Sequence, residues 1–134
     1  MAAKAEYAYK HNVTLTVGAG LLLGGQYFDD ATHHLQNRDL EGAKDDLLKM
    51  KGAYSAADSI LTSGYYPPPS CCSAFYSQAH RLLIDEVSMA QYLWGCTYDK
   101  QHGYDSGDCD TAKRLAGPLG DSQTAWVNAA QPWL

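Results

Sequence analysis

Apolar and small residues recur at helical spacing along the first segment of the chain, from Ala2 to about Asn37. They occupy positions 13, 17, 20, 21, 24, 28, 31 and 35, the spacing of one face of a long helix. Val13–Val17 alternates β-branched residues with leucine, a pattern that also fits a short strand. Because no partner strand is evident elsewhere in the sequence, a helix is predicted here.

Four glycines interrupt this first helical segment, at positions 18, 20, 24 and 25. Each weakens a helix by about 1 kcal/mol relative to alanine. Their presence is explained if another helix approaches closely along this face, or if the helix kinks there.

Two further segments carry an apolar stripe. Asp39 is predicted to cap a helix that ends at Ser63–Gly64 and whose apolar face consists of Leu40, Ala43, Leu47, Met50, Tyr54, Ala57 and Leu61. After the stiff connector Tyr65–Pro69, Ser70 is predicted to cap a third helix that runs through about Cys96. Its apolar residues are Phe75, Ala79, Leu82, Leu83, Val87, Ala90, Leu93 and Trp94.

The last quarter of the chain predicts a polar loop over 97–108 and a shorter fourth helix from about Asp110. This helix is expected to break at Gly117–Gly120, to resume at a cap on Asp121 or Ser122, and to end at Pro132. Four amphipathic helices with short connections predict an all-α fold, an antiparallel four-helix bundle forming a single helical domain over 1–134.

The four cysteines constrain the ends of this bundle. An unbroken third helix separates Cys71 and Cys72 from Cys96 by roughly 37 Å at 1.5 Å per residue, whereas a disulfide needs Cα atoms within about 7 Å. Cys96 and Cys109 flank one loop and are the expected pair. Cys71 and Cys72 are left to a vicinal disulfide, to a bond with a second subunit, or to two free thiols, and the free thiols are favoured. A break in the third helix would reopen pairing with Cys109.

Composition narrows the partners and the compartment. The 134 residues are 46% hydrophobic and 19% charged, with a net charge of −5, which disfavours nucleic acid and anionic membrane surfaces. The run Val13–Leu23 is too short for a membrane span. An even cysteine count favours a secreted, periplasmic or cell-surface protein. Ten tyrosines against two phenylalanines are typical of partly wet surfaces and interfaces.

Several residues are candidates for metal or cofactor binding. Asp30 and His34 stand four apart on a helix, a spacing that allows one metal to be shared, although solvated pairs at this spacing are commoner. Tyr76 and His80 are one turn apart, and both residue types ligate haem iron. In the loop, calcium would use Asp105 and Asp108. Zinc is a further alternative for Cys96, His102 and Cys109.

No enzyme signature accompanies these residues. The sequence has no Gly-x-Ser-x-Gly elbow, phosphate-binding glycine loop or Rossmann fingerprint. Asp85 and Glu86 are expected to face solvent, because neighbours on a helix diverge by about 100°. The expected function is a non-enzymatic binding or assembly module without a cofactor that meets a protein partner or itself, for instance as a homodimer. Its interface would use Cys71, Cys72, Tyr98 and Tyr104. The alternative is a small carrier of a metal ion or haem.

Overall fold

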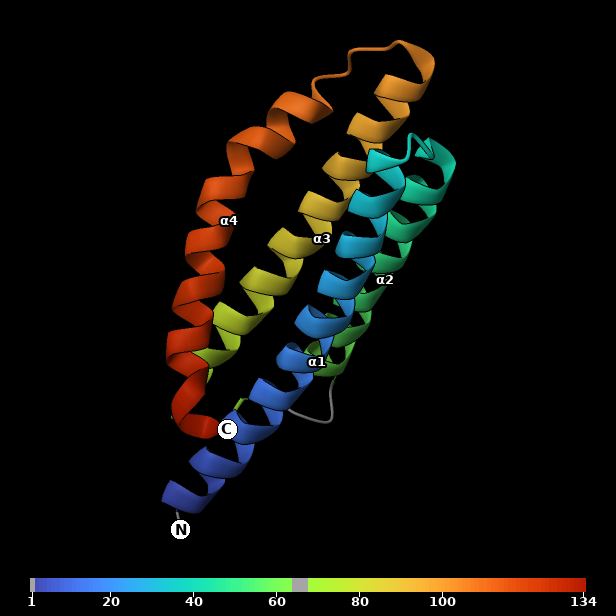
Figure 1. Cartoon of the computed structure of the whole chain (residues 1–134). Coiled ribbons are helices and arrows are strands. Elements are labelled where there is room, and N and C mark those ends of the chain that lie inside the picture. The colour runs from blue at the N-terminus through green and yellow to red at the C-terminus, as the bar shows by residue number, and fades with distance from the viewer. Residues whose placement is uncertain (1, 64–67) are drawn as a thin grey trace.

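The computed structural model describes residues 2–63 and 68–134, which form four helices packed against one another. They are α1 (Ala2–Gln36), α2 (Leu40–Thr62), α3 (Ser73–His102) and α4 (Asp108–Ala130), followed by the short 3₁₀ turn η1 (Gln131–Trp133). Successive helices run in opposite directions (Figure 1). The all-α four-helix prediction is confirmed, and Val13–Val17 lies within α1 rather than in a strand.

Two of the four glycines in α1 allow a close approach to α2. A Cβ at Gly20 would lie 2.6 Å from the Cβ of Ala57, and one at Gly24 would lie 2.6 Å from the hydroxyl oxygen of Tyr54. Real Cβ atoms do not come so close to other atoms, so both positions require glycine. Gly18 and Gly25 face open space.

The turn between α1 and α2 and the apolar face of α2 agree with the sequence prediction. The Asp39 side chain accepts a hydrogen bond from the backbone N–H of Gly42 at 2.9 Å, as an N-cap does. Along α2 the predicted face is buried apart from the half-buried Leu40. The helix ends before Ser63, while Gly64 and residues 65–67 of the predicted connector lie outside the described residues.

Helix α3 differs from its predicted bounds at both ends. It begins at Ser73 with Cys72 in the N-cap position, so the predicted cap at Ser70 is wrong. It also continues past Cys96 to His102, through a polar stretch predicted as loop. Gly103 ends it in the left-handed conformation, with φ of +70°. Within this polar stretch, buried Asp99 accepts hydrogen bonds from the backbone and hydroxyl of Ser106 at 3.0 and 2.5 Å, which tie the following loop to the helix.

Helix α4 runs unbroken through Pro118, so the predicted interruption at Gly117–Gly120 is wrong. The missing N–H of Pro118 leaves the carbonyl of Arg114 without its helical partner, and both residues lie on the exposed side of the helix. Gly117 also lacks the Cβ that would crowd the proline ring, so the helical conformation is open to the residue before proline.

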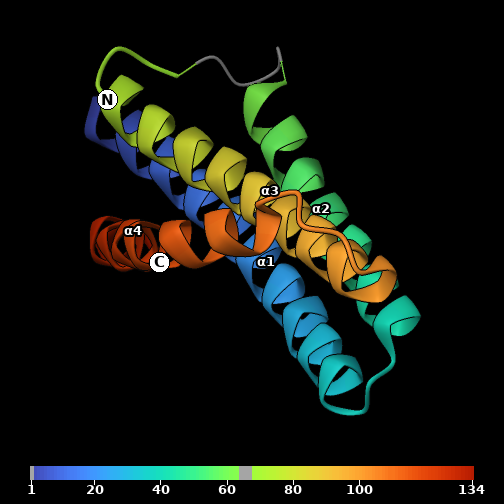
Figure 2. The ribbon, with the colours of Figure 1, turned by 90° about the horizontal axis from the view of Figure 1, so that it is seen from above.

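Both ends of α4 are fastened to the rest of the bundle. At its start, Cys109 and Cys96 of α3 lie at disulfide distance, as predicted. At its end, the Trp126 ring packs on Phe75 of α3 with centroids 4.9 Å apart. Beyond it, His11 Nδ1–H of α1 donates to the Trp133 carbonyl at 2.6 Å. Seen from above, α4 crosses the direction of the other three helices (Figure 2).

No helix in the described ranges 2–63 and 68–134 is long and apolar enough to cross a membrane.

Candidate ligand-binding site

A cleft of about 660 Å³ lies between the middle of α4 and the other three helices. All four helices line it. The lining residues are Leu21, Gly25 and Phe28 of α1, Met50 and Tyr54 of α2, Glu86, Met89, Leu93 and Cys96 of α3, and Cys109, Ala112, Lys113, Ala116, Leu119, Gly120 and Gln123 of α4. Most of these side chains are apolar, and two are flexible methionines that adapt to the shape of a neighbour.

The cleft exists because α4 presents small residues to it. Ala112, Ala116 and Gly120 follow one another at intervals of four, so they share one face of the helix. A larger side chain at any of them would extend toward α1. Helix α4 is held at both ends, by Cys109 at its start and by Trp126 near its end, and Phe28 on the opposite wall of the cleft remains 43% exposed.

A buried carboxyl group contributes to the α3 wall of this cleft. Glu86 is 1% exposed, its Oε1 accepts a hydrogen bond from Nε2 of Gln123, and the Tyr54 hydroxyl donates a second one. Burial raises the pKa of Glu86, and the hydrogen bonds from Gln123 and Tyr54 offset part of that rise. Burial likewise raises the pKa of Tyr54. Glu86 forms no ion pair within the described residues.

The expectation that Glu86 faces solvent is therefore wrong, although exposed Asp85 agrees with it. A signal for the burial of Glu86 was present in the sequence. Glu86 stands four residues after Leu82 and four before Ala90, both buried members of the predicted stripe. Position on the helix decides which way a side chain points, whatever its chemical type.

Lys113, exposed on α4, is the other charged residue among the described lining residues. It stands ten positions before Gln123, which corresponds to roughly 15 Å along a helix. The positive and negative groups of the cleft therefore belong to different ends: Lys113 near the Cys96–Cys109 pair, and Glu86 beside Gln123.

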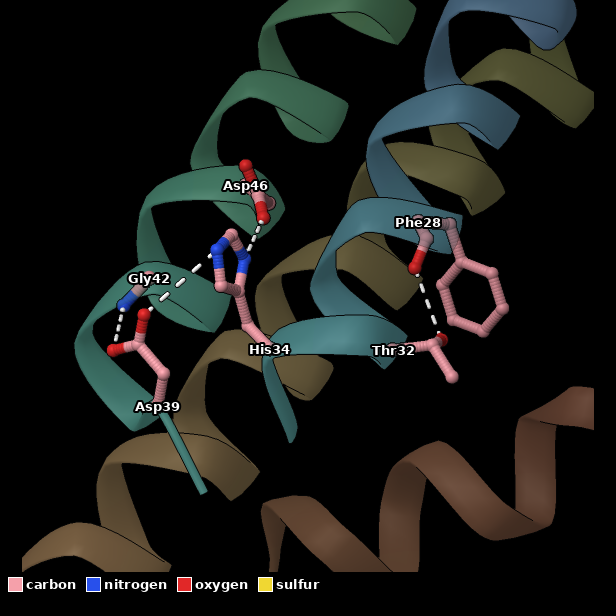
Figure 3. A network of polar contacts seen from close by, with 6 residues as sticks. All are labelled: Phe28, Thr32, His34, Asp39, Gly42 and Asp46. Carbon is pink, nitrogen blue, oxygen red and sulfur yellow. Dashed lines mark hydrogen bonds and ion pairs between the residues drawn. The ribbon is translucent and has the colours of Figure 1, made fainter. Parts of the chain in front are cut away.

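The predicted metal residue His34 lies outside this cleft and contacts α2. Its Nδ1–H donates to Oδ2 of the buried Asp46 at 2.5 Å, and its Nε2 lies 3.7 Å from Oδ2 of Asp39. Figure 3 shows the imidazole between these two carboxylates. The predicted partner Asp30 is exposed. The sequence suggested Asp30 as the partner of His34 because the two stand four residues apart, whereas the structure pairs His34 with Asp46 of another helix.

The predicted haem residues Tyr76 and His80 also lie outside the cleft. Nδ1–H of His80 donates to Oδ1 of Asp58 in α2 at 2.6 Å, and the Tyr76 ring stacks on the imidazole with centroids 5.8 Å apart. A histidine held by a neighbouring side chain is the structural role that such a residue commonly has in a bundle.

At the end of the bundle where α3 meets α4, aromatic rings form a ladder. Tyr98 lies 4.2 Å from His102 and 6.0 Å from the exposed Tyr104, measured between ring centroids. In the adjoining loop, Asp105 accepts a hydrogen bond from the backbone N–H of Gly107 at 3.2 Å. Asp108 begins α4, with its carboxylate in the space that a Cβ of Gly95 would need.

Cys71 and Cys72 also lie at disulfide distance, and the described residues include no free cysteine. The expectation of two free thiols there is therefore wrong. The Cys96–Cys109 pair in turn takes up both sulfurs that a zinc site with His102 would need. Within the described part of the chain, no group of three or more His, Cys, Asp or Glu side chains is placed to hold a metal ion.

Comparison of the chain with protein-family models, with curated proteins and with solved structures found no match in any of the three.

Proposed function

We propose that this protein is a non-enzymatic binding protein that holds a small apolar molecule in the cleft between α4 and the other helices. The observation that carries the proposal is the cleft itself, about 660 Å³ with a mostly apolar lining. Sites for small molecules measure about 300–1,000 Å³ and combine apolar walls with a few placed polar groups. Glu86, Gln123 and Tyr54 supply such a group here.

The two cysteine pairs support a location outside the cytoplasm. Disulfides persist in secreted, periplasmic and cell-surface proteins and are rare where thiols are kept reduced. The pair Cys96–Cys109 also has a role in the proposed site, because it fastens the start of α4 at the edge of the cleft.

The test uses Nile red, a neutral dye whose emission rises in apolar surroundings. We expect saturable binding at one site in about the micromolar range, as ligand efficiency gives for a drug-sized molecule. Replacing Ala116 with tryptophan fills the cleft from α4 and should weaken dye binding about tenfold or more. Circular dichroism confirms that the variant remains helical.

The matched control is Ala125→Trp. Ala125 lies on the same helix, is exposed and is not part of the cleft lining, so this variant adds the same ring without filling the cleft. It should bind the dye as the wild type does. Failure of the wild type to bind the dye, or equal binding by Ala116→Trp, would contradict the proposed site.

Assembly with a protein partner or a second copy stays a prediction from the sequence, as does binding of a metal ion or haem. Light scattering on the purified protein measures the first, and elemental analysis with absorbance spectra after haem addition measures the second.

A further inference from the structure

The cleft contains one acidic side chain among its described lining residues, and that side chain is buried. Glu86 accepts hydrogen bonds from Gln123 and Tyr54, two neutral donors. In its ionised form a carboxylate accepts about four hydrogen bonds, so these two donors leave capacity for another. A buried carboxylate without a cationic partner is unfavourable, because neutral groups replace only part of its lost hydration.

We propose that the ligand of this cleft is an apolar molecule carrying a protonated amine, which pairs with Glu86. This inference rests on the proposed function, since it names the chemical class that the same cleft selects. The ammonium group would donate to the carboxylate and supply the positive charge that the surrounding protein lacks. The rings of Phe28 and Tyr54 also line the cleft, and aromatic faces attract cations.

Other head groups fit the Glu86 end less well. A carboxylate or phosphate on the ligand would meet a like charge there, and Lys113 lies roughly 15 Å away along α4. An alcohol would donate a hydrogen bond to the carboxylate without supplying a positive charge, whereas an ammonium group supplies both. The cleft therefore discriminates by charge at one end and by apolar contact along the rest.

The experiment measures octylamine, octanol and octanoate as competitors of Nile red at pH 7.5. The three share one alkyl chain and differ in the head group. For the wild type we expect octylamine to compete at a concentration about tenfold below that of octanol, with octanoate the weakest, from the typical strength of a charged hydrogen bond. In Glu86→Gln, which keeps the size and one acceptor oxygen but removes the negative charge, the advantage of octylamine over octanol should disappear.

Asp85→Asn is the matched control, because it removes the same charge from the exposed neighbouring position. It should keep the preference for octylamine. Equal competition by octylamine and octanol in the wild type, or a preference that survives Glu86→Gln, overturns the amine inference while leaving the apolar cleft intact. A preference for octanoate also overturns the amine inference, and it would mean that the ligand's head group binds near Lys113. If none of the three competes and Nile red does not bind, both proposals fail.

Discussion

Helix α1 meets α2 and α4 in opposite ways, although small residues face it at both boundaries. Against α2, Gly20 and Gly24 have no room for a Cβ, because Ala57 and Tyr54 fill the space. Against α4, Gly25 has nothing within 4 Å of a Cβ position, and Gly120 across the cleft has equally open space. Adjacent glycines of one helix thus serve a closed interface and an open cleft.

The difference lies in what holds the partner helix. Helix α2 packs against α1 along its whole length through apolar side chains. Where α1 has glycine in place of a larger residue, the two backbones therefore come closer together. In contrast, α4 is fastened at its ends by the Cys96–Cys109 pair and by Trp126 on Phe75, so removal of side chains in its middle leaves space. Small residues close an interface when the helix is free to approach and open a cleft when it is not.

The strongest test of this contrast removes the fastening at the start of α4. The double variant Cys96→Ser/Cys109→Ser should lose about 3 kcal/mol of stability, the entropy contribution of a loop of roughly 14 residues. Chemical denaturation followed by circular dichroism measures the loss. Because the freed end of α4 no longer keeps its distance from α1, Nile red affinity should fall as well.

The vicinal pair provides the control for this experiment. Cys71 and Cys72 are adjacent, so their bond restricts the unfolded chain very little. Cys71→Ala/Cys72→Ala should cost far less than 3 kcal/mol, through the lost packing of the buried Cys72 side chain, and should leave dye affinity unchanged. Equal losses in the two double variants would show that the Cys96–Cys109 pair does not hold α4 in place.

A second test compares the adjacent glycines of α1. Gly24→Ala places a methyl group against the Tyr54 ring and should destabilise the protein by about 2 kcal/mol, as overpacking of a filled core does. Gly25→Ala adds the same methyl group on the open side. It should stabilise the protein by up to about 1 kcal/mol through helix propensity.

Thermal unfolding of the two variants beside the wild type gives the comparison directly. Opposite signs at positions 24 and 25 support the division of α1 into a closed and an open side. Destabilisation of similar size at both would mean that α4 lies closer to α1 than the cleft requires.

The sequence predicted the fold wherever hydrophobic period and turn chemistry agreed. The stripe of α2, the cap at Asp39 and the Cys96–Cys109 pair are all confirmed. The predictions are wrong where the residue types suggested a loop or a break although the residues lie within a helix. Residues 97–102 are polar yet helical: Asp99 is buried and hydrogen-bonded to Ser106, and the helix ends only at Gly103. Helix α4 passes Pro118, because Gly117 relieves the clash that normally ends a helix before proline.

The cleft could not be predicted in the same way. Its lining comes from all four helices, and its volume depends on the distance at which α4 is held, which no local pattern encodes. The position of Glu86 on the buried stripe was readable from the sequence, but its chemical type suggested solvent. The two histidine candidates failed for a related reason, since Asp46 and Asp58, which hold His34 and His80, come from a different helix.

The smallest expected effect concerns Glu86, the buried carboxyl group of the open cleft. Burial raises the pKa of Glu86 in the folded protein above its value of about 4.3 in an unfolded chain. Between these two values the folded state binds more protons than the unfolded state. Stability therefore falls as pH rises from about 4.3 toward the raised pKa and is lowest above it. Glu86→Gln does not titrate and should escape this loss.

The measurement is the difference in unfolding free energy between Glu86→Gln and the wild type at pH 4 and pH 8. Groups distant from position 86 are the same in both proteins, so their contributions cancel in this difference. We expect the difference to move in favour of Glu86→Gln at pH 8. A saturating amine ligand should shrink that difference, because it stabilises the ionised carboxylate of the wild type alone. A difference independent of pH would mean that Glu86 has water access through the cleft and titrates as in the unfolded chain.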